Sequence, residues 1–419
     1  MSGYYHRVHT REVPTAIVPP RRISASIPVV VGTAPVHLLS EGQDKPINEP
    51  VLCYTFKEFV EQLGFTDEAD ANSMFKYTLC EFADVFFGKC NVAPIVVINV
   101  FDPATHKTGE AADVTKVTAA DIVGGYDADG GTYTGLELVS KVFPKFRVVP
   151  GQILAPGFSH DPAVGVVMDT KASTINGIFS CLALTDIPDA TCTKYTDVPS
   201  WKETNNYTGK HTVCCWPKVT LGKHVYNMST YLAGLIAQTD ADYEGIPYVS
   251  PSNRRMPISG AVANGKPVHL ELPQAEYLNG QGVVTALNFD GGWKAFGNRT
   301  ACYPSNTDPK DAFISVRRFF SWHANTFVLT YFQKLDGPTT RRFIETIVDS
   351  ENIRLNGFKQ MEIILGGEIF FYQEENPTTD LIDGVVRFHT KMTPPVPARE
   401  IVNILEFDVT NFQNLFGSN

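Results

Sequence analysis

The last residues of the chain form a strand-like segment that a proline-rich spacer separates from everything before it. Residues 400–409 (EIVNILEFDV) are rich in the aliphatic and aromatic side chains that favour β-strands. The spacer holds Pro394, Pro395 and Pro397, and because proline has no backbone N–H, a β-ladder cannot run through it. A strong strand behind a stiff spacer is poorly placed to become a central strand of its own sheet. We therefore expect residues 394–419 to form an arm that reaches out of the domain it follows.

The beginning of the chain repeats this arrangement. Residues 4–13 (YYHRVHTREV) suit an extended segment, and Pro19 and Pro20 separate them from an apolar strand predicted at 27–31. A fully extended arm of about 20 residues spans at most roughly 70 Å, enough to cross a neighbouring subunit. We hypothesise mutual strand donation, in which each body offers a sheet edge and each arm completes the sheet of another subunit. The alternative is that the arms fold back on their own body or fray, as chain ends usually do.

The stretch before the C-terminal arm changes from a helical to a strand period. Apolar residues recur at three- and four-residue steps over 311–333, after the capping pair Asp308-Pro309, and again over 338–356. Two strands are predicted next, at 361–372 and 385–392, and in the second of them apolar and polar side chains alternate. We expect residues 309–393 to form a C-terminal domain of two helices and a hairpin.

The remaining chain alternates strands and helices, which is typical of an α/β body. Residues 103–149 differ because they are small, polar and rich in glycine, and they are predicted to be an insertion on the surface of that body. The predicted fold is therefore mixed α/β (α+β) and multidomain, with an N-terminal arm at 1–22 and a discontinuous body at 23–102 and 150–308. Body strands are predicted at 24–34, 92–101, 153–159, 178–184, 213–219 and 282–287, and body helices at 55–63, 71–87, 162–173 and 228–238.

Composition narrows the partners and the compartment. A net charge of −10 and a pI near 5.5 argue against nucleic acid as the main partner, because phosphate binding needs a positive surface. No apolar run is long enough to span a membrane, and the start of the chain lacks the pattern of a signal peptide. The eight cysteines form no C-x-x-C framework, so we expect reduced, buried thiols in a protein made in the cytoplasm.

The chemical inventory gives no reason to expect an enzyme. There is no P-loop, no G-x-G-x-x-G and no H-E-x-x-H motif. Ser159, His160 and Asp161 are the residue types of a catalytic triad, but three consecutive residues cannot adopt its mutual geometry. The sequence at 127–130 (DADG) suggests a calcium loop, yet Leu138 stands where a bidentate glutamate is needed, which favours a plain turn. We predict no catalytic residue, no metal site and no cofactor.

Eight segments, spread in order over almost the whole chain, together resemble the contractile tail sheath protein of bacteriophages with long contractile tails. None of them is catalytic, and each is weak alone, but the ordered set is fairly specific. The segments are SASIPVVVGTA (24–34), ILAPGFS (153–159), SPSN (250–253), FGNRT (296–300), VRRFF (316–320), NPTTDLIDG (376–384), PPVPAREI (394–401) and NFQNLF (411–416).

The resemblance implies a role for each predicted part. In that family the terminal arms of neighbouring subunits add strands to another subunit's C-terminal domain and link hexameric rings into a mesh around an inner tube. Here residues 4–13 and 400–409 would be the donor arms, the hairpin 361–392 the acceptor, and helices 311–333 and 338–356 the tube-facing part, with 103–149 facing outward. The implied contact residues are Tyr5, Arg7, Val8, Arg11 and Val13 in the N-terminal arm, Ile401, Val402, Ile404, Leu405, Phe407 and Val409 in the C-terminal arm, Ile369, Phe371, Val386 and Phe388 in the acceptor, and Pro19, Pro20, Pro394, Pro395 and Pro397 as hinges.

The resemblance also implies partners and a location. The partners would be further copies of this chain, a tail tube protein, and baseplate and tail terminator proteins, with no direct contact to nucleic acid and no membrane insertion. The location would be a virion tail, assembled in the cytoplasm of a host bacterium. The alternative from a different class is an α/β enzyme or ligand-binding protein whose extended ends are incidental.

Overall fold

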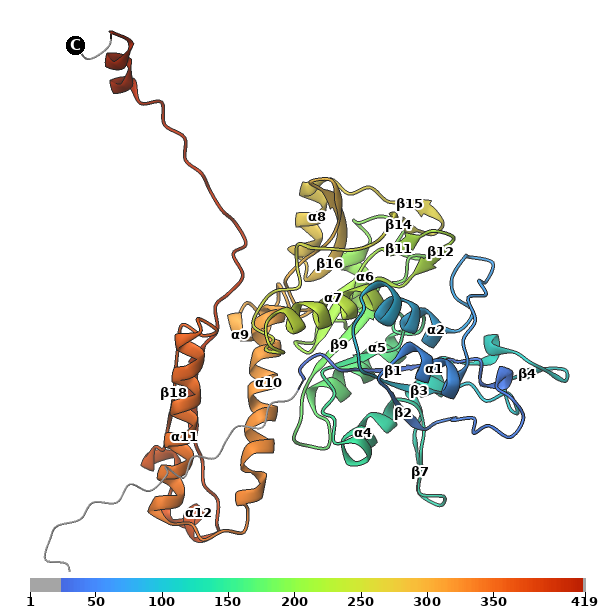
Figure 1. Ribbon diagram of the computed structural model, residues 1–419, viewed down its shortest axis with the longest axis horizontal. Helices are drawn as coiled ribbons and strands as arrows, with labels where there is room; N and C mark the ends of the chain where they lie inside the picture. Colours follow the sequence, from blue (N-terminus) through green and yellow to red (C-terminus); the bar gives the residue numbers. More distant parts are fainter. Residues whose placement is uncertain (1–23, 417–419) are drawn as a thin grey trace, which may run out of the picture.

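A nine-stranded mixed sheet forms the centre of the body in the computed structural model, which describes residues 24–416 (Figure 1). Six neighbouring strands run parallel, from β3 through β1, β8, β9 and β10 to β16. Antiparallel strands complete the sheet at both ends. At one end β2 pairs with β3, and at the other β17 pairs with β16 and β13 pairs with β17. In sheet order the strands are β13 (Arg254–Arg255), β17 (Gly292–Phe296), β16 (Val283–Phe289), β10 (Thr212–Cys215), β9 (Leu182–Asp186), β8 (Gln152–Leu154), β1 (Pro28–Gly32), β3 (Ile95–Asn99) and β2 (Pro50–Cys53).

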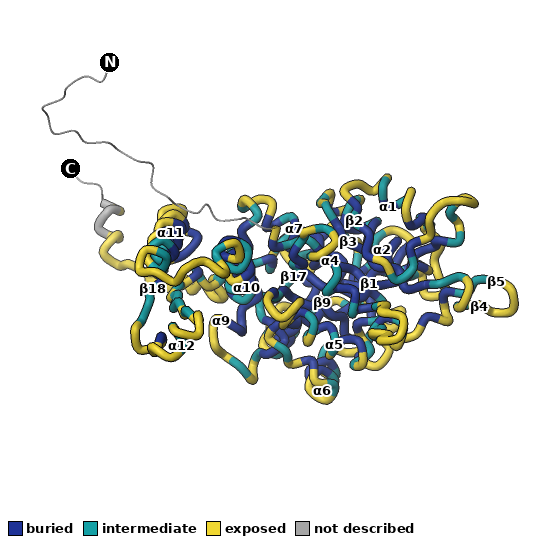
Figure 2. The backbone as a smooth tube through the Cα atoms, turned by 90° about the horizontal axis from the view of Figure 1, so that it is seen from below, coloured by how far each residue is buried: buried dark blue, intermediate teal, exposed yellow. Residues whose placement is uncertain are grey.

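The parallel strands are buried on both faces. Helices α5 (Pro162–Ser173) and α7 (Met228–Asp242) contact the same three strands, β8, β9 and β10, and Figure 2 shows them on opposite sides of β9. The nearly all-apolar run predicted at 92–101 accordingly contains β3, whose five residues are all buried. Helix α5 spans the residues predicted for it, because Asp161 accepts a hydrogen bond from the N–H of Ala163 and Pro162 occupies the first turn.

Smaller elements complete the body. A four-stranded antiparallel sheet lies beside the main sheet in the order β12 (His224–Tyr226), β11 (Lys218–Leu221), β14 (Gly260–Ala263) and β15 (Lys266–Pro267). The other body helices are α1 (Phe56–Leu63), α2 (Thr78–Ala83), α6 (Val198–Thr204) and α8 (Leu272–Asn279), with a short helical turn η1 (Val36–Leu38).

The helix predicted at 71–87 is wrong in its first half. Residues before Thr78 form a turn, in which the Asp70 carboxylate accepts hydrogen bonds from the N–H groups of Asn72 and Met74. Phe75 bridges back to Ala69 instead of continuing a helix. The helix therefore begins only at α2 and then widens into the π-helix η2 (Asp84–Lys89).

Residues 103–149 are partly embedded in the body and partly projecting from it. Two exposed hairpins extend outward, β4 (Lys107–Thr108) with β5 (Ala111–Ala112) and β6 (Tyr126–Asp127) with β7 (Thr132–Tyr133) (Figure 1). The sequence predicted a turn at 127–130, and the β6–β7 turn lies there. In contrast, Ile122, Leu136 and Val142 are fully buried in the main core. The segment also holds η3 (Val114–Lys116), α3 (Ala119–Val123), η4 (Gly135–Leu138) and α4 (Val139–Phe146).

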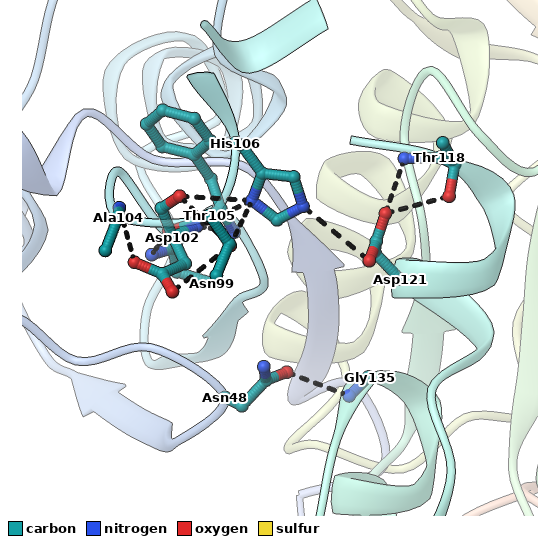
Figure 3. Close-up of polar contacts among 10 residues, drawn as sticks. Asn48, Asn99, Asp102, Ala104, Thr105, His106, Thr118, Asp121 and Gly135 are labelled. Carbon is teal, nitrogen blue, oxygen red and sulfur yellow. Dashed lines mark hydrogen bonds and ion pairs between the residues drawn. The ribbon is translucent and has the colours of Figure 1, made fainter. Parts of the chain in front are cut away.

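Polar contacts fix the base of this segment to the body and to itself (Figure 3). The Asn48 side-chain oxygen accepts a hydrogen bond from the N–H of Gly135 at 3.0 Å. Nε2 of His106 lies 3.6 Å from Oδ1 of Asp121, and the other carboxylate oxygen of Asp121 accepts from the N–H of Thr118. The expectation of a surface insertion therefore describes the two hairpins and not the helices between and after them.

The C-terminal part is a pair of long helices with a hairpin. Helix α10 (Ile314–Tyr331) begins after a break at Phe313, which adopts extended backbone and bridges to Arg299, so the predicted helix 311–333 is divided. Helix α11 (Arg341–Gln360) runs through the predicted stop at 356–357, because Phe358 is buried against Phe319 and Trp322. The other elements are α9 (Pro309–Ala312), η5 (Phe332–Lys334), β18 (Gly366–Phe370), η6 (Gln373–Glu375), α12 (Thr378–Ile382), β19 (His389–Thr393) and η7 (Val409–Phe416).

Candidate intersubunit surfaces

The C-terminal arm leaves the molecule, and its residues 401–409 are exposed on every side in the described structure. Beyond β19 the backbone continues away from the hairpin in an extended conformation, and the described chain ends with the short helix η7 (Figure 1). Its apolar side chains are exposed, with 91% of Ile401 and 86% of Leu405 accessible. The six residues predicted as arm contacts all lie in this exposed stretch and form no ladder within residues 24–416, namely Ile401, Val402, Ile404, Leu405, Phe407 and Val409. In the single chain this arm does not fold back on its own body.

The arm starts at a cleft of about 540 Å³ between the body and residues 398–400, which follow the proline spacer. Pro394 is buried and Pro395 and Pro397 are half-buried, so the predicted hinge is held at its beginning. The cleft brings together two of the segments that carry the resemblance, 250–253 and 296–300, because the Ser252 hydroxyl accepts a hydrogen bond from the N–H of Gly297 at 3.0 Å.

Arg299 stands at the wall of this cleft. Its guanidinium lies 3.7 Å from the ring centre of Phe313 and 4.3 Å from that of Tyr303. The nearby Arg399 belongs to the arm and also lines the cleft. Sequence reasoning did not single out Arg299, and only its place within the segment 296–300 pointed to it.

The hairpin predicted as acceptor is a two-stranded sheet in the described part of the chain. Strands β18 and β19 pair antiparallel, with Gly366 opposite Thr393 and Phe370 opposite His389. Helix α11 packs against β18, and Ile369 is buried at 1% exposure. A two-stranded hairpin is marginal by itself, and an open outer edge of such a hairpin exposes backbone groups that a further strand can pair.

The predicted acceptor residues differ in position. Ile369 lies within β18, whereas Phe371 directly follows that strand and stands 6.2 Å, ring to ring, from Phe388. The prediction that Val386 and Phe388 belong to the second strand is wrong, since β19 begins at His389. The strands diverge there because the Asn376 side chain inserts between them, accepting from the N–H of Arg387 at 2.7 Å and donating to the carbonyl of Tyr372 at 2.8 Å.

A buried ion pair joins the C-terminal part to the body. Arg318 of α10 donates to both carboxylate oxygens of Asp240 in α7, and one of these bonds is 2.9 Å long. The same guanidinium donates to the carbonyl of Ala25, the second residue of the described chain, at 3.2 Å. The predicted N-terminal contacts and hinge lie outside the described residues, namely Tyr5, Arg7, Val8, Arg11, Val13, Pro19 and Pro20.

The serine of the triad-type sequence 159–161 is engaged by other residues of the body. Ser159 is fully buried, and its hydroxyl hydrogen-bonds Asp186, which also accepts from the N–H of Ser229. Across residues 24–416 no three His, Cys, Asp or Glu side chains are grouped to hold a metal ion, and no helix is long and apolar enough to cross a membrane. All eight cysteines are free and buried, as predicted, and burial raises the pKa of Cys80 to about 12.

Comparison with known proteins places the chain. No family model matches it. It is 25% identical, over 388 residues and 90% of each chain, to a putative prophage major tail sheath protein of Pseudomonas aeruginosa. It is 24% identical to the tail sheath protein of Burkholderia phage BcepMu over the whole of both chains.

Solved structures share the fold. The chain superposes on a chain of the anti-feeding prophage baseplate, 6-fold symmetrised, with a TM-score of 0.68 and 13% identity over 97% of this chain and all of that one. It superposes equally well, at 0.68 and 14% identity, on the sheath complex of an extracellular contractile injection system in the contracted state, covering 98% of this chain and 99% of that one.

An α/β body with an open hairpin and a free strand-forming arm defines a structural protein that assembles with other subunits. In its fold and over its full length, the chain is similar to contractile tail sheath proteins, as its eight segments indicated. It is a structural subunit of a contractile sheath. The alternative of an enzyme or ligand-binding protein finds no support in these comparisons.

Proposed function

We propose that this chain polymerises as hexameric rings stacked helically around an inner tail tube, and that the stack contracts to drive the tube through a target cell envelope. The observation that carries the proposal is the exposed row of apolar side chains on residues 401–409, next to a hairpin of only two strands. Each C-terminal arm would add a strand to the hairpin of a neighbour, and the N-terminal residues 4–13 would add a further strand to the same sheet. The neighbours' sheath and baseplate assemblies support this reading of the fold.

The proposed division of labour follows the predicted domains. The body, 23–102 and 150–308, would carry the contacts that change on contraction. The C-terminal domain, 309–393, would face the tube through α10 and α11, and the hairpins of 103–149 would face outward. The partners would be other copies, the tube protein, and baseplate and terminator proteins, in a tail assembled in a bacterial cytoplasm.

The energy for contraction would come from burial between subunits. The sequence holds no nucleotide-binding motif. An extra 400 Å² or so of apolar contact per subunit would release on the order of 10 kcal/mol, at about 25 cal/mol per Å², before opposing costs. Arms that stay paired on their proline hinges would let the bodies rotate while the lattice remains connected. Extended and contracted lattices with equal buried area would remove this source of energy.

Electron microscopy of the purified chain tests the proposal. The full chain is expected to form tubes or rings, whereas a chain ending at Thr393 is expected to form discrete folded particles. Leu405→Asp should act like the truncation, because it places a charge among the side chains that a neighbour would bury. Val396→Asp is the matched control, since Val396 is an exposed apolar residue of the spacer outside 401–409. Polymers that survive both the truncation and Leu405→Asp would reject strand donation by this arm.

A further inference from the structure

The two edges of the acceptor hairpin are not equivalent, because a side chain already occupies one of them. Asn352 of α11 contacts the backbone of Ile369 in β18 with both ends of its amide. Its oxygen accepts from the N–H of Ile369 at 3.0 Å, and its nitrogen donates to the carbonyl of Ile369 at 3.3 Å. These are the two hydrogen bonds that a residue of a neighbouring strand would make.

The strand register shows which edge Asn352 occupies. In an antiparallel strand the N–H and C=O of one residue point to the same side, and successive residues alternate between sides. Because both groups of Ile369 are bonded to Asn352, they point away from β19. Helix α11 also packs closely on one face of β18, since a Cβ on Gly367 would lie 3.3 Å from Cδ2 of Leu355. The outer edge of β18 is thus paired at Ile369 by an asparagine of the helix that packs against the strand.

The outer edge of β19 has no such cover. Ile369 lies opposite Thr390 and Gly367 opposite Met392, so the backbone groups of Thr390 and Met392 also point outward, on the far side of the hairpin. In the described part of the chain no side chain or loop hydrogen-bonds to them. Asn376, which also bonds backbone groups in this region, lies between the two strands and leaves this edge open.

We propose that Asn352 caps β18, so that the hairpin accepts the C-terminal arm of a second copy, residues 401–409, at β19 alone. This rests on the strand donation proposed above. The arm is amphipathic in a strand conformation, with Leu405 and Phe407 on one face and Glu406 and Asp408 on the other.

The two faces of β19 match those of the arm. Met392 packs against the core of the C-terminal part, whereas Lys391, on the opposite face, is exposed and lies over the rings of Phe370 and Tyr372. An arm strand beside β19 therefore continues the apolar face with Leu405 and Phe407. It also places the carboxylates of Glu406 and Asp408 on the face that carries the ammonium of Lys391.

Disulfide trapping in the assembled polymer distinguishes the two edges. Glu368 and Lys391 lie opposite each other on the solvent face, one in each strand, and both are exposed. Each double variant carries one hairpin cysteine, Glu368→Cys or Lys391→Cys, and one arm cysteine. The arm cysteine is Ile404→Cys, Glu406→Cys or Asp408→Cys, three positions on one face of the arm. Only adjacent strands can be bridged, because a disulfide needs Cα atoms within about 7 Å and strands lie about 4.8 Å apart. The eight buried native thiols are poor competitors.

We expect intersubunit disulfides with Lys391→Cys for at least one arm position, and none with Glu368→Cys. Disulfides with Glu368→Cys would overturn the choice of edge while leaving strand donation intact. Polymers that form no disulfide from either strand, at any of the three arm positions, would reject donation by the C-terminal arm itself, and with it this inference.

The role of Asn352 has its own test. Asn352→Ala removes both hydrogen bonds to Ile369, so disulfides with Glu368→Cys should now appear. Asn356→Ala is the matched control, because Asn356 is an exposed asparagine one turn further along α11. Thermal unfolding of both variants checks that the hairpin is retained. A folded Asn352→Ala chain that still uses only β19 would show that the helix, and not the amide, selects the edge.

Discussion

The body and the C-terminal part differ in how much unpaired backbone the edge strands of their sheets expose. At one end of the nine-stranded sheet, β13 consists of only two residues, Arg254 and Arg255, so little backbone is left open and both side chains are charged. The hairpin β18–β19 leaves a five-residue strand open, beside an arm of exposed apolar side chains. Natural sheets keep edges short and charged to avoid unwanted pairing. The difference teaches that this end of the body sheet offers little backbone for pairing, whereas β19 offers a five-residue edge.

The largest expected effect comes from disconnecting the two parts. Arg318→Leu leaves the carboxylate of Asp240 buried without its partner, which should lower the free energy of unfolding by about 3–5 kcal/mol. The C-terminal part should then unfold before the body, giving two transitions in urea. Arg341→Leu is the control, because its ion pair with Glu345 is exposed and pairs of that kind contribute about 0–1 kcal/mol. A single unshifted transition for Arg318→Leu would mean that the ion pair does not hold the parts together.

The same substitution in the two parts should separate folding from assembly. Leu184→Ala removes a fully buried side chain of β9 and should cost about 2–5 kcal/mol of stability. Leu405→Ala changes a side chain that is 86% exposed, so the unfolding midpoint of the single chain should not move, yet polymer formation should weaken. Chemical denaturation and sedimentation of polymers measure the two properties. Loss of stability in Leu405→Ala would show that the arm packs on its own subunit in solution.

The body should lose stability as the pH rises. Burial raises the pKa of Glu81, whose carboxylate accepts from the N–H of Asn227 at 2.7 Å, from 4.5 to about 8. Because the folded state holds this proton more tightly, its stabilising contribution is complete below pH 4.5 and is lost as the pH passes through about 8. Glu81→Gln should flatten the pH dependence of the urea midpoint across this window. Burial also raises the pKa of Asp186, so some dependence should persist. An unaltered slope in Glu81→Gln would contradict the prediction.

The C-terminal part should show the opposite dependence on pH. Burial, with the nearby guanidinium of Arg354, lowers the pKa of His323 from 6.5 to about 3. The unfolded chain therefore takes up the proton first, and stability is lost as the pH falls from 6.5 towards 3. Hydrogen exchange should rise with acid in peptides of α10 and α11 before those of α5. In His323→Gln this early rise should be absent, and acid sensitivity confined to α5 would refute the assignment.

Local signals predicted the elements, and long-range pairing decided what they could not. Asp161 and Pro162 fix the start of α5 by themselves, and the sequence located that helix correctly. The break at Phe313 depends on its bridge to Arg299, and the extension of α11 depends on Phe358 meeting Phe319. Neither partner is near in sequence, so no local pattern could reveal them.

The candidate surfaces divide in the same way. The arm was predictable because a proline spacer and an apolar strand are local features. The late start of β19 was not predictable. It depends on Asn376, which belongs to neither strand but whose side chain separates the chain after β18 from the chain before β19. The capping of Ile369 by Asn352 needs the helix and the strand to be placed in space first. The sequence shows only an asparagine in the middle of a predicted helix, which does not indicate that its side chain pairs with a strand.

The contact of Arg318 with the carbonyl of Ala25 has a mechanical consequence. A pull exerted on the chain ahead of Ser24 would reach this guanidinium before it reached β1. The guanidinium is anchored in α10 and clamped to Asp240 in α7, so the tension would be divided between two helices of different parts. A moving lattice could then drag each subunit as one rigid piece, instead of peeling the first strand from its sheet.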